Sequence, residues 1–433
     1  MNLLYSNDRE GVYPPSWYAA TAAMAPEFPP LDGDRKHDVC VIGGGYSGLS
    51  CALHLAENGY DVVLLDAHRV GWGASGRNGG QLGSGQRLRQ TILEKKYGAD
   101  HARKLWQLGE EAKALVRSLI ERFAISCDYK PGIVHADHRA RFVGNTKREV
   151  DLLREAYGYQ KIRFVERAEL RQMLATDAYH GGSLDTGSGH LHPLNFALGL
   201  ARAAAQAGVR ILERTQVTAV RKGDPARVET ATGNVRANFV LLACNGYLGL
   251  LESDVARRVM PINNYILATR PLPQDVARQL IRDDVAVADS RFVINYFRLS
   301  ADRRLIFGGG ESYGYRFPAD IKAYVRKPMI EIYPQLRDVQ IDYGWGGTLA
   351  ITMSRLPHLA RLAPNILSIS GYSGHGLGMA TLSGKLAAQA IRGTAERFDV
   401  LASLPASAFP GGPAMRWPLL VLAMFYHAML DRV

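Results

Sequence analysis

The sequence predicts an α/β region built on a buried parallel sheet, joined to an α+β region with a mixed or antiparallel sheet. Three observations support this prediction. Continuous apolar, β-branched runs at 38–42 and 62–65 flank a helical stripe, which is the pattern of a βαβ unit. Similar short apolar runs recur at 239–243 and 366–370. Alternating runs within 292–307 instead predict an antiparallel hairpin.

The first βαβ unit is the clearest element. Residues 38–42 predict a strand that is buried on both faces. Apolar positions from 49 to 56 recur at helical spacing, and Gly59 can end that helix. Residues 62–65 predict the second strand, which ends at Asp66.

Later elements repeat the alternation in separated pieces. Residues 194–207 predict an Ala-rich helix ended by Gly208, and strands follow at 209–212 and 217–220. A last helix is expected from about Met379. Both regions are therefore expected to be assembled from separate stretches of chain. We assign 36–85, 190–250 and 345–400 to the α/β region, 86–189 and 255–345 to the α+β region, 1–35 to an irregular lead-in and 401–433 to a C-terminal segment.

Composition is that of a folded globular protein, because 47% of the 433 residues are hydrophobic and 21% are charged. The net charge is +11, but Lys and Arg are scattered without a run of four and without an aromatic-basic repeat. A basic surface is therefore favoured over nucleic-acid binding. The four cysteines and the pair His190 and His192 lack the spacing or the further ligands of a metal site, so no metal is expected.

The two ends of the chain bear on location. The first residues lack the basic and apolar regions of a secretory signal, which favours a cytoplasmic protein. The apolar stretch at 417–430 is shorter than the roughly 20 residues that span a bilayer. It lacks a Lys/Arg-rich polar face, so packing as a buried helix is favoured over contact with a membrane surface.

A glycine-rich loop predicts a dinucleotide site. Gly43-Gly-Gly45-Tyr-Ser-Gly48 follows the first strand and opens the helix, as in a G-x-G-x-x-G fingerprint. Gly43 allows the tight turn, Gly45 allows approach of a pyrophosphate, and Gly48 allows close packing of helix and strand. Asp66 ends the next strand, where its carboxylate can accept hydrogen bonds from ribose hydroxyls and disfavours a 2′-phosphate.

FAD and NAD both fit this unit, and the loop at 71–80, Gly-Trp-Gly-Ala-Ser-Gly-Arg-Asn-Gly-Gly, distinguishes them by resemblance. It resembles the second flavin-contacting loop of the FAD-dependent oxidoreductases related to D-amino-acid oxidase, glycine oxidase and sarcosine oxidase. Within that group the chain resembles the γ-glutamylputrescine oxidase family in order along nearly its whole length. The segments that carry this closer resemblance are 74–81, 187–195, 296–302, 308–310, 341–346, 371–376 and 409–412.

The resemblance implies a Rossmann-like FAD-binding domain with an interleaved substrate domain, and noncovalent FAD. It places the 74–81 loop along the flavin ring and residue 217 against the adenine. The loop at 371–376 precedes a helix, so its N–H groups can face the flavin where negative charge collects on reduction. The expected cofactor contacts are Gly43, Gly45, Tyr46, Ser47, Gly48, Asp66, Ala67, Ala74, Ser75, Arg77, Asn78, Gly79, Gly80, Gln81, Val217, Ala243, Asn245, Ser373, Gly374, His375 and Gly376.

The implied reaction is oxidation of a primary amine, such as γ-glutamylputrescine or a related polyamine conjugate. Hydride transfer to flavin N5, hydrolysis of the imine to an aldehyde and ammonia, and reoxidation by oxygen or another acceptor would complete it. Arginine can hold a substrate carboxylate and aromatic faces can attract an ammonium. The expected pocket residues are Tyr265, Tyr296, Arg298, Trp345 and His375, with Arg291 and Phe297 as less favoured neighbours. No catalytic base is identified, since a desolvated amine could lose its proton without one.

Three other functions stay open at this point. The same flavin site could oxidise a D-amino acid or an N-methyl amino acid, with a quinone as acceptor through the C-terminal segment. An NAD dehydrogenase is opposed by the loops at 71–80 and 371–376. An RNA-acting protein is suggested only by the basic charge balance.

Overall fold

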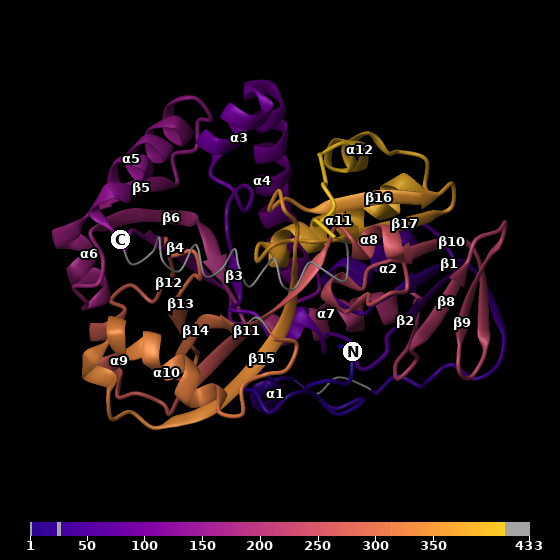
Figure 1. The fold of residues 1–433 in the computed structure, drawn as a ribbon, viewed down its shortest axis with the longest axis horizontal. Coiled ribbons are helices and arrows are strands. Elements are labelled where there is room, and N and C mark those ends of the chain that lie inside the picture. The colour runs from indigo at the N-terminus through magenta and orange to yellow at the C-terminus, as the bar shows by residue number, and fades with distance from the viewer. Residues whose placement is uncertain (1, 24–26, 313, 412–433) are drawn as a thin grey trace.

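The computed structural model describes residues 2–23, 27–312 and 314–411, and two sheets form its framework (Figure 1). The first sheet has eight strands, and six of them follow the order β16-β17-β10-β1-β2-β7. Strand β10 also pairs with β9, which pairs with β8. The strands are β1 (Arg35–Ile42), β2 (Val62–Leu65), β7 (Arg210–Leu212), β8 (Val217–Arg221), β9 (Ala226–Thr230), β10 (Asn234–Leu242), β16 (His358–Ala363) and β17 (Ile366–Ser370).

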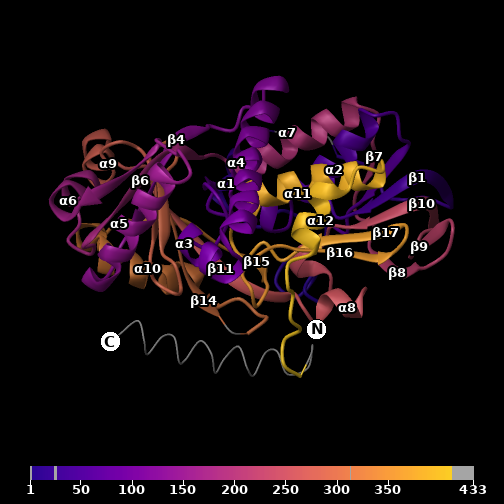
Figure 2. The same cartoon turned by 90° about the horizontal axis from the view of Figure 1, so that it is seen from above.

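The predicted βαβ unit is confirmed. Strand β1 pairs in parallel with β2 on one side and β10 on the other, and β10 pairs in parallel with β17. The strands β2 and β17 have the predicted bounds because their short apolar runs are buried along their whole length. Helices α2 (Tyr46–Ala56), α7 (Pro193–Gln206) and α11 (Gly376–Ile391) lie together on one side of this sheet (Figure 2).

The second sheet has nine strands, in the order β15-β11-β14-β13-β12-β4-β6-β3, with β5 paired to β6. The predicted hairpin is confirmed as β13 and β14, which pair antiparallel, although β13 begins at Tyr296 and not at Phe292. The strands are β3 (Gln81–Leu82), β4 (Lys130–Ala136), β5 (Ile162–Glu166), β6 (Gly181–His190), β11 (Met260–Thr269), β12 (Ala286–Asp289), β13 (Tyr296–Leu299), β14 (Leu305–Ser312) and β15 (Ile341–Ile351).

The points at which the chain passes from one sheet to the other differ from two of the expected region boundaries. Strand β15 pairs with β11 over its whole length, so the expected boundary at 345 falls inside a strand of the second sheet. Strand β3 pairs with the end of β6, so that sheet already includes residues 81–82. These strands connect the flavin-type loops directly to the second sheet.

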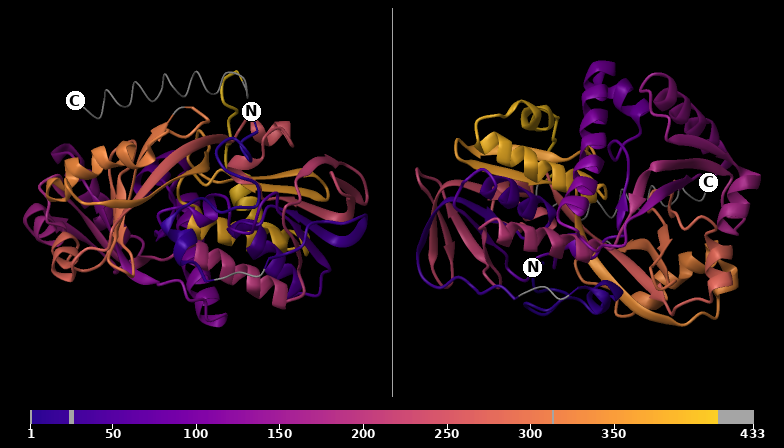
Figure 3. Two further views of the ribbon diagram at one scale, coloured as in Figure 1. Left: turned by 90° about the horizontal axis from the view of Figure 1, so that it is seen from below. Right: turned by 180° about the vertical axis from the view of Figure 1, so that it is seen from behind.

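Helices fill the space around both sheets. The long helix α4 (Ala99–Arg122) packs against α11 and α3, and from behind it stands between the C-terminal helices and the layer of α5 (Figure 3). The expected irregular lead-in contains the short helix α1, which buries Trp17 and Tyr18. The remaining helices are α1 (Trp17–Thr21), α3 (Gln90–Tyr97), α5 (Ala140–Glu155), α6 (Arg167–Leu174), α8 (Ser253–Ala256), α9 (Gln274–Leu280), α10 (Ile321–Ile332) and α12 (Glu396–Ala402), with single-turn helices at Ala74–Gly76, Asn245–Tyr247 and Pro334–Leu336.

Among the described residues, no helix is both long and apolar enough to cross a bilayer. The apolar stretch at 417–430 lies outside the described residues.

Candidate active site

A large cavity of ≈ 1190 Å³ takes its walls from both sheets. One wall consists of the loops that leave β1 and β17, together with the 72–79 segment. The other wall carries side chains of β4, β6 and β12. Both the predicted cofactor loops and a part of the second sheet therefore face one continuous space.

The glycine loop is shaped by close backbone contacts. Gly43 has φ +111°, and a Cβ built on it would lie 2.7 Å from the carbonyl oxygen of Ala243. A Cβ on Gly48 would lie 1.9 Å from the carbonyl oxygen of Gly43, so only glycine allows the helix to start this close to the strand. Helix α2 begins after Gly45 without a side-chain cap, and its first N–H groups and positive dipole end face the cavity wall.

Asp66 stands at the end of β2 and lines the same space. Its carboxylate accepts hydrogen bonds from the N–H groups of Gly44 (2.7 Å) and His68 (2.8 Å), which fix its orientation. Burial raises the pKa of Asp66 to about 6, against the effect of those two bonds. Each oxygen keeps a further lone pair, so the carboxylate can still accept from a ribose hydroxyl.

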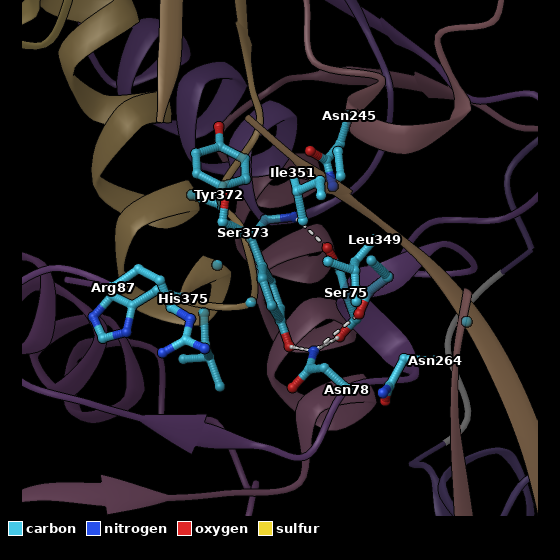
Figure 4. A pocket seen from close by; sticks show the side chains of 18 of the residues that line it. Ser75, Asn78, Arg87, Asn245, Asn264, Leu349, Ile351, Tyr372, Ser373 and His375 are labelled. Atoms are coloured by element: carbon cyan, nitrogen blue, oxygen red, sulfur yellow. Dashed lines mark hydrogen bonds between the residues drawn. The ribbon is translucent and has the colours of Figure 1, made fainter. Parts of the chain in front are cut away.

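The loop at 74–80 is braced by its own side chains (Figure 4). Asn78 donates to the carbonyl oxygens of Ala74 (2.9 Å) and Ser75 (3.0 Å) and accepts from the N–H of Gly80 (2.8 Å). The Ser75 hydroxyl accepts from the N–H of Tyr46 (3.0 Å), which ties the loop to the start of α2. These bonds hold a flat, small-residue surface against the cavity.

Arg77 belongs to this loop but is held by protein groups. Its guanidinium donates to the carbonyl oxygen of Trp72 (2.7 Å), pairs with Asp8 (2.7 Å) and lies 4.3 Å over the Trp72 ring. It therefore supports the loop from the side, although it also lines the cavity.

The loop at 371–376 enters α11. Ser373 and Gly374 both have positive φ, and the N–H of Ser373 donates to the carbonyl oxygen of Ala350 (2.9 Å). Helix α11 has no side-chain cap at His375, so its N-terminal dipole is directed toward the cavity. Burial, with a contribution from the nearby Arg87 charge, lowers the pKa of His375 to about 4. The imidazole is neutral near pH 7, which suits a hydrogen-bonding group.

These features fit an FAD molecule. The two uncapped helix starts suit its diphosphate and the reduced flavin, and Asp66 suits its ribose. Gly48 and Gly80 do not line the cavity; they act through backbone packing. The expected contacts that line it are Gly43, Gly45, Tyr46, Ser47, Asp66, Ala67, Ala74, Ser75, Arg77, Asn78, Gly79, Gln81, Val217, Ala243, Asn245, Ser373, Gly374, His375 and Gly376.

Two of the expected substrate-pocket residues, Tyr296 and His375, line the cavity. The Tyr296 ring lies against two glycines: a Cβ on Gly79 would come within 2.6 Å of it, and one on Gly308 within 2.1 Å. Its hydroxyl donates to the side chain of Asn264, which also lines the cavity. The aromatic ring therefore stands directly beside the 74–80 loop.

Three expected pocket residues lie elsewhere. Tyr265 is fully buried and packs edge-on against Phe317 and Tyr324 in the core of the second sheet. Trp345 is 1% exposed and donates its indole N–H to the carbonyl oxygen of Arg77 (3.1 Å). In both cases a large ring on an alternating strand faces the protein core and not the cavity.

Arg298 is 3% exposed and is also not in the cavity wall. Its guanidinium donates to the carbonyl oxygens of Gly79 (3.0 Å) and Leu299 (3.1 Å) and to the hydroxyl of Tyr18 (3.2 Å). It supports the flavin-type loop from behind, so it cannot hold a substrate carboxylate. Of the less favoured neighbours, Arg291 lines the cavity and pairs with Asp289, whereas Phe297 is buried in the core.

Sequence reasoning missed most of the second wall. A polar cluster joins Lys113, Ser84 and Asp185, and Tyr159 donates to Asp185 (2.6 Å). Helix α4, the segments after β3 and α5, and strand β6 each supply one of these residues, so only the tertiary fold brings them together and no local motif marks them. The missed side chains in this wall are Ser84, Arg87, Arg89, His135, Asp137, Ser183, Asp185, Asn264 and Asp289.

His190 and His192 have structural partners. His190 Nε2 lies 2.9 Å from the carbonyl oxygen of Asp284, and His192 Nδ1 accepts from the N–H of Asn195 (3.1 Å) at the start of α7. Burial lowers the pKa of both imidazoles to about 3. Across the described ranges, no group of three or more His, Cys, Asp or Glu could hold a metal ion.

Comparisons with known proteins show the family to which the chain belongs. The profile of the DAO family, described as FAD dependent oxidoreductase, matches residues 38–390. The chain is 43% identical to the probable oxidoreductase OrdL of Rhizobium meliloti, over 96% of this chain and 97% of that protein. It is 42% identical to the gamma-glutamylputrescine oxidoreductase of Escherichia coli, over 96% of this chain and 98% of that protein.

Solved structures share the fold at low identity. The glycine oxidase of Geobacillus kaustophilus superposes with a TM-score of 0.71 at 21% identity, covering 83% of this chain and 95% of that one. The L-amino acid deaminase of Proteus myxofaciens superposes with a TM-score of 0.69 at 19% identity, covering 90% and 96%. Since the family profile spans most of the chain and the close relatives span nearly all of it, the chain belongs to the DAO family and is an FAD-dependent oxidoreductase.

Proposed function

We propose that this enzyme oxidises a primary amine, with γ-glutamylputrescine or a related polyamine conjugate as substrate. The observation that carries the proposal is the continuous cavity in which the FAD-type loops face a second wall with three buried carboxylates, Asp137, Asp185 and Asp289. The same wall carries Arg87, Arg89 and Arg291, so it presents both signs of charge and suits a molecule that carries both ammonium and carboxylate groups. The high identity to a gamma-glutamylputrescine oxidoreductase supports the choice of amine.

FAD, when bound, supplies the two-electron acceptor that removes hydride from the carbon bearing the amine. Side chains of the protein bind and orient the substrate. Tyr296 presents an aromatic face beside the 74–80 loop, where it can attract the substrate's cationic end. His375 offers a neutral imidazole next to the start of α11.

Ion pairs in the wall formed by β4, β6 and β12 could bind the γ-glutamyl end of the substrate. Arg89 lies 3.6 Å from Asp137, and Arg291 pairs with Asp289. A γ-glutamyl group carries a carboxylate and an ammonium, and an adjacent Arg and Asp can recognise one each. Enclosure by these side chains would also exclude water from the reacting carbon and strengthen each charge interaction.

Anaerobic reduction of the bound FAD tests the proposal. We expect γ-glutamylputrescine to bleach the visible flavin spectrum faster than putrescine, D-alanine or sarcosine, and oxygen to restore the colour with release of peroxide. Putrescine serves as the matched control, because it has the same reacting end but no glutamyl group. Bleaching by D-alanine or sarcosine alone would transfer the assignment to an amino-acid oxidase, and failure of oxygen to restore colour would point to another acceptor.

A further inference from the structure

One face of the second sheet forms the cavity wall, and His135 stands on it. Ile133 and His135 lie two residues apart on β4 and both line the cavity, as expected for one face of a strand, and Asp137 directly after the strand lines it as well. Val134, which lies between the first two, is buried in the core on the opposite face, whereas Ala136 at the end of the strand is buried and also borders the cavity. Unlike those two neighbours, His135 is exposed, and the space to which it is exposed is the cavity.

Strand register puts His135 in one row with Tyr296. His135 is paired with Ser183 of β6 and with Ala288 of β12, and Ala288 is paired with Tyr296 of β13. Since neighbouring strands lie about 4.8 Å apart, the backbones of the two residues are separated by roughly 10 Å, and the residue between them in the row, Ala288, has only a methyl side chain. A small group that enters this gap would contact His135 and would lie beside the Tyr296 ring, which touches Gly79 of the flavin-type loop.

Several charged or titratable groups bear on the His135 imidazole. Asp185 on β6 favours its protonated form, whereas Arg87 and Arg89, which precede α3, oppose it. His375 lies near it in front of α11. The wall also holds Asp137 just after β4 and the Asp289–Arg291 pair at the end of β12, and Lys113 of α4 interacts with Asp185. Desolvation is the largest influence and lowers the pKa of His135, so the ring is neutral near pH 7 and has a nitrogen lone pair.

The amine must lose a proton before its carbon can release hydride, because the nitrogen lone pair has to become available. A primary ammonium has an ordinary pKa near 10.4, so only about one molecule in a few thousand is neutral in water at pH 7. Transfer to an imidazole becomes feasible only where desolvation in the cavity also lowers the pKa of the bound ammonium, and a base placed there would then raise the rate by about 10²- to 10⁴-fold.

We propose that His135 is this proton acceptor and a catalytic residue. An N–H bond of the substrate ammonium breaks and an N–H bond forms on the imidazole, which gives a neutral amine and an imidazolium without any change in oxidation state. The carboxylate of Asp185 stabilises the imidazolium, and the proton passes to water after the product has left the cavity. This inference rests on the proposed amine oxidation.

The test is the rate of anaerobic FAD reduction by γ-glutamylputrescine between pH 6 and pH 10. His135→Gln should be about 100-fold slower than the unmodified enzyme at pH 7. The deficit should shrink to a few-fold at pH 10, where solution supplies the neutral amine. Added imidazole should accelerate His135→Ala. The matched control is His101→Gln on α4, outside the cavity wall, which should follow the unmodified profile.

The visible flavin spectrum and the melting temperature check that each variant is folded and loaded, and His135→Asn replaces His135→Gln if the latter loses FAD. A deficit that is equal at every pH, or a rise in KM with unchanged reduction rate, would overturn the proton-acceptor role. If no amine reduces the flavin of the unmodified enzyme, the proposed function itself fails. Normal reduction by the amine with a normal His135→Gln profile would remove only the role of His135.

Discussion

The two walls of the cavity are built on different principles. On the cofactor side, loops at 43–48, 74–79 and 373–376 present backbone groups at points where the chain enters or braces a helix. On the opposite side, strands β4, β6, β12 and β13 present side chains that meet only through their register. The shape of the cofactor wall depends on glycines, which leave room for close backbone approach. The chemistry of the opposite wall depends on which strand side chains the register places next to one another.

The largest effect is expected from Gly48→Ala on the cofactor wall. The new Cβ would lie 1.9 Å from the carbonyl oxygen of Gly43. The clash cannot be relieved by a side-chain rotation, because the atom that it meets belongs to the backbone. Helix α2 would have to move away from β1, which displaces the N–H groups that suit the diphosphate. We expect more than a 100-fold loss of FAD affinity, measured by titration of apoprotein with FAD.

Gly144→Ala is the matched control for that substitution. Gly144 lies inside α5, where an added Cβ would meet only Arg148 Nη1 at 3.6 Å, and Ala favours a helix over Gly. FAD affinity should be unchanged and the melting temperature equal or slightly higher. Equal FAD affinity in Gly48→Ala and Gly144→Ala would show that close packing at Gly48 is not needed for the cofactor.

This contrast explains how far the sequence could be interpreted. The βαβ unit, its glycine loop and Asp66 are contiguous, and their chemistry follows from backbone geometry, so their positions were predictable. Tyr265, Trp345 and Arg298 were misplaced because alternation along a strand tells which residues share a face but not which face meets the cavity. His135 and Asp185 carry no local signal, since their approach depends on β4 pairing with β6 across about 50 residues of sequence.

Gly308→Ala tests the second wall without touching the first. Its Cβ would come within 2.1 Å of the Tyr296 ring, so that ring must leave its place beside Gly79. FAD content should stay normal, while kcat/KM for the amine falls about 10-fold to 100-fold, because misplacing a substrate-positioning group costs on this scale. The control is the same change in a Tyr296→Leu background, where it should add little further loss. An equal loss in both backgrounds would mean that Gly308 does not act through Tyr296.

The smallest expected effect is a change in FAD affinity with pH, which tests one side chain of the cofactor wall, Asp66. The Asp66 carboxyl has a pKa of about 6 in the folded protein, raised by burial from an ordinary 3.8. Its own contribution to folding stability is therefore present below pH 3.8 and is lost as the pH rises through about 6. FAD binding has the opposite dependence, because ribose hydroxyls donate to the ionised carboxylate. Acidification from pH 7.5 to pH 5.0 should raise the Kd for FAD about tenfold.

The Asp66→Asn variant shows whether the pH dependence of FAD binding comes from Asp66 or from another titratable group. Its Kd should be higher at pH 7.5 and nearly flat down to pH 5.0, since the amide does not titrate. His375 cannot mimic the effect, because its pKa of about 4 keeps it neutral over most of this range. Fluorescence titration of apoprotein with FAD measures both profiles. A flat profile in the unmodified protein, or tighter binding in acid, would mean that Asp66 does not receive the ribose, and the cofactor wall would then rest on its backbone groups alone.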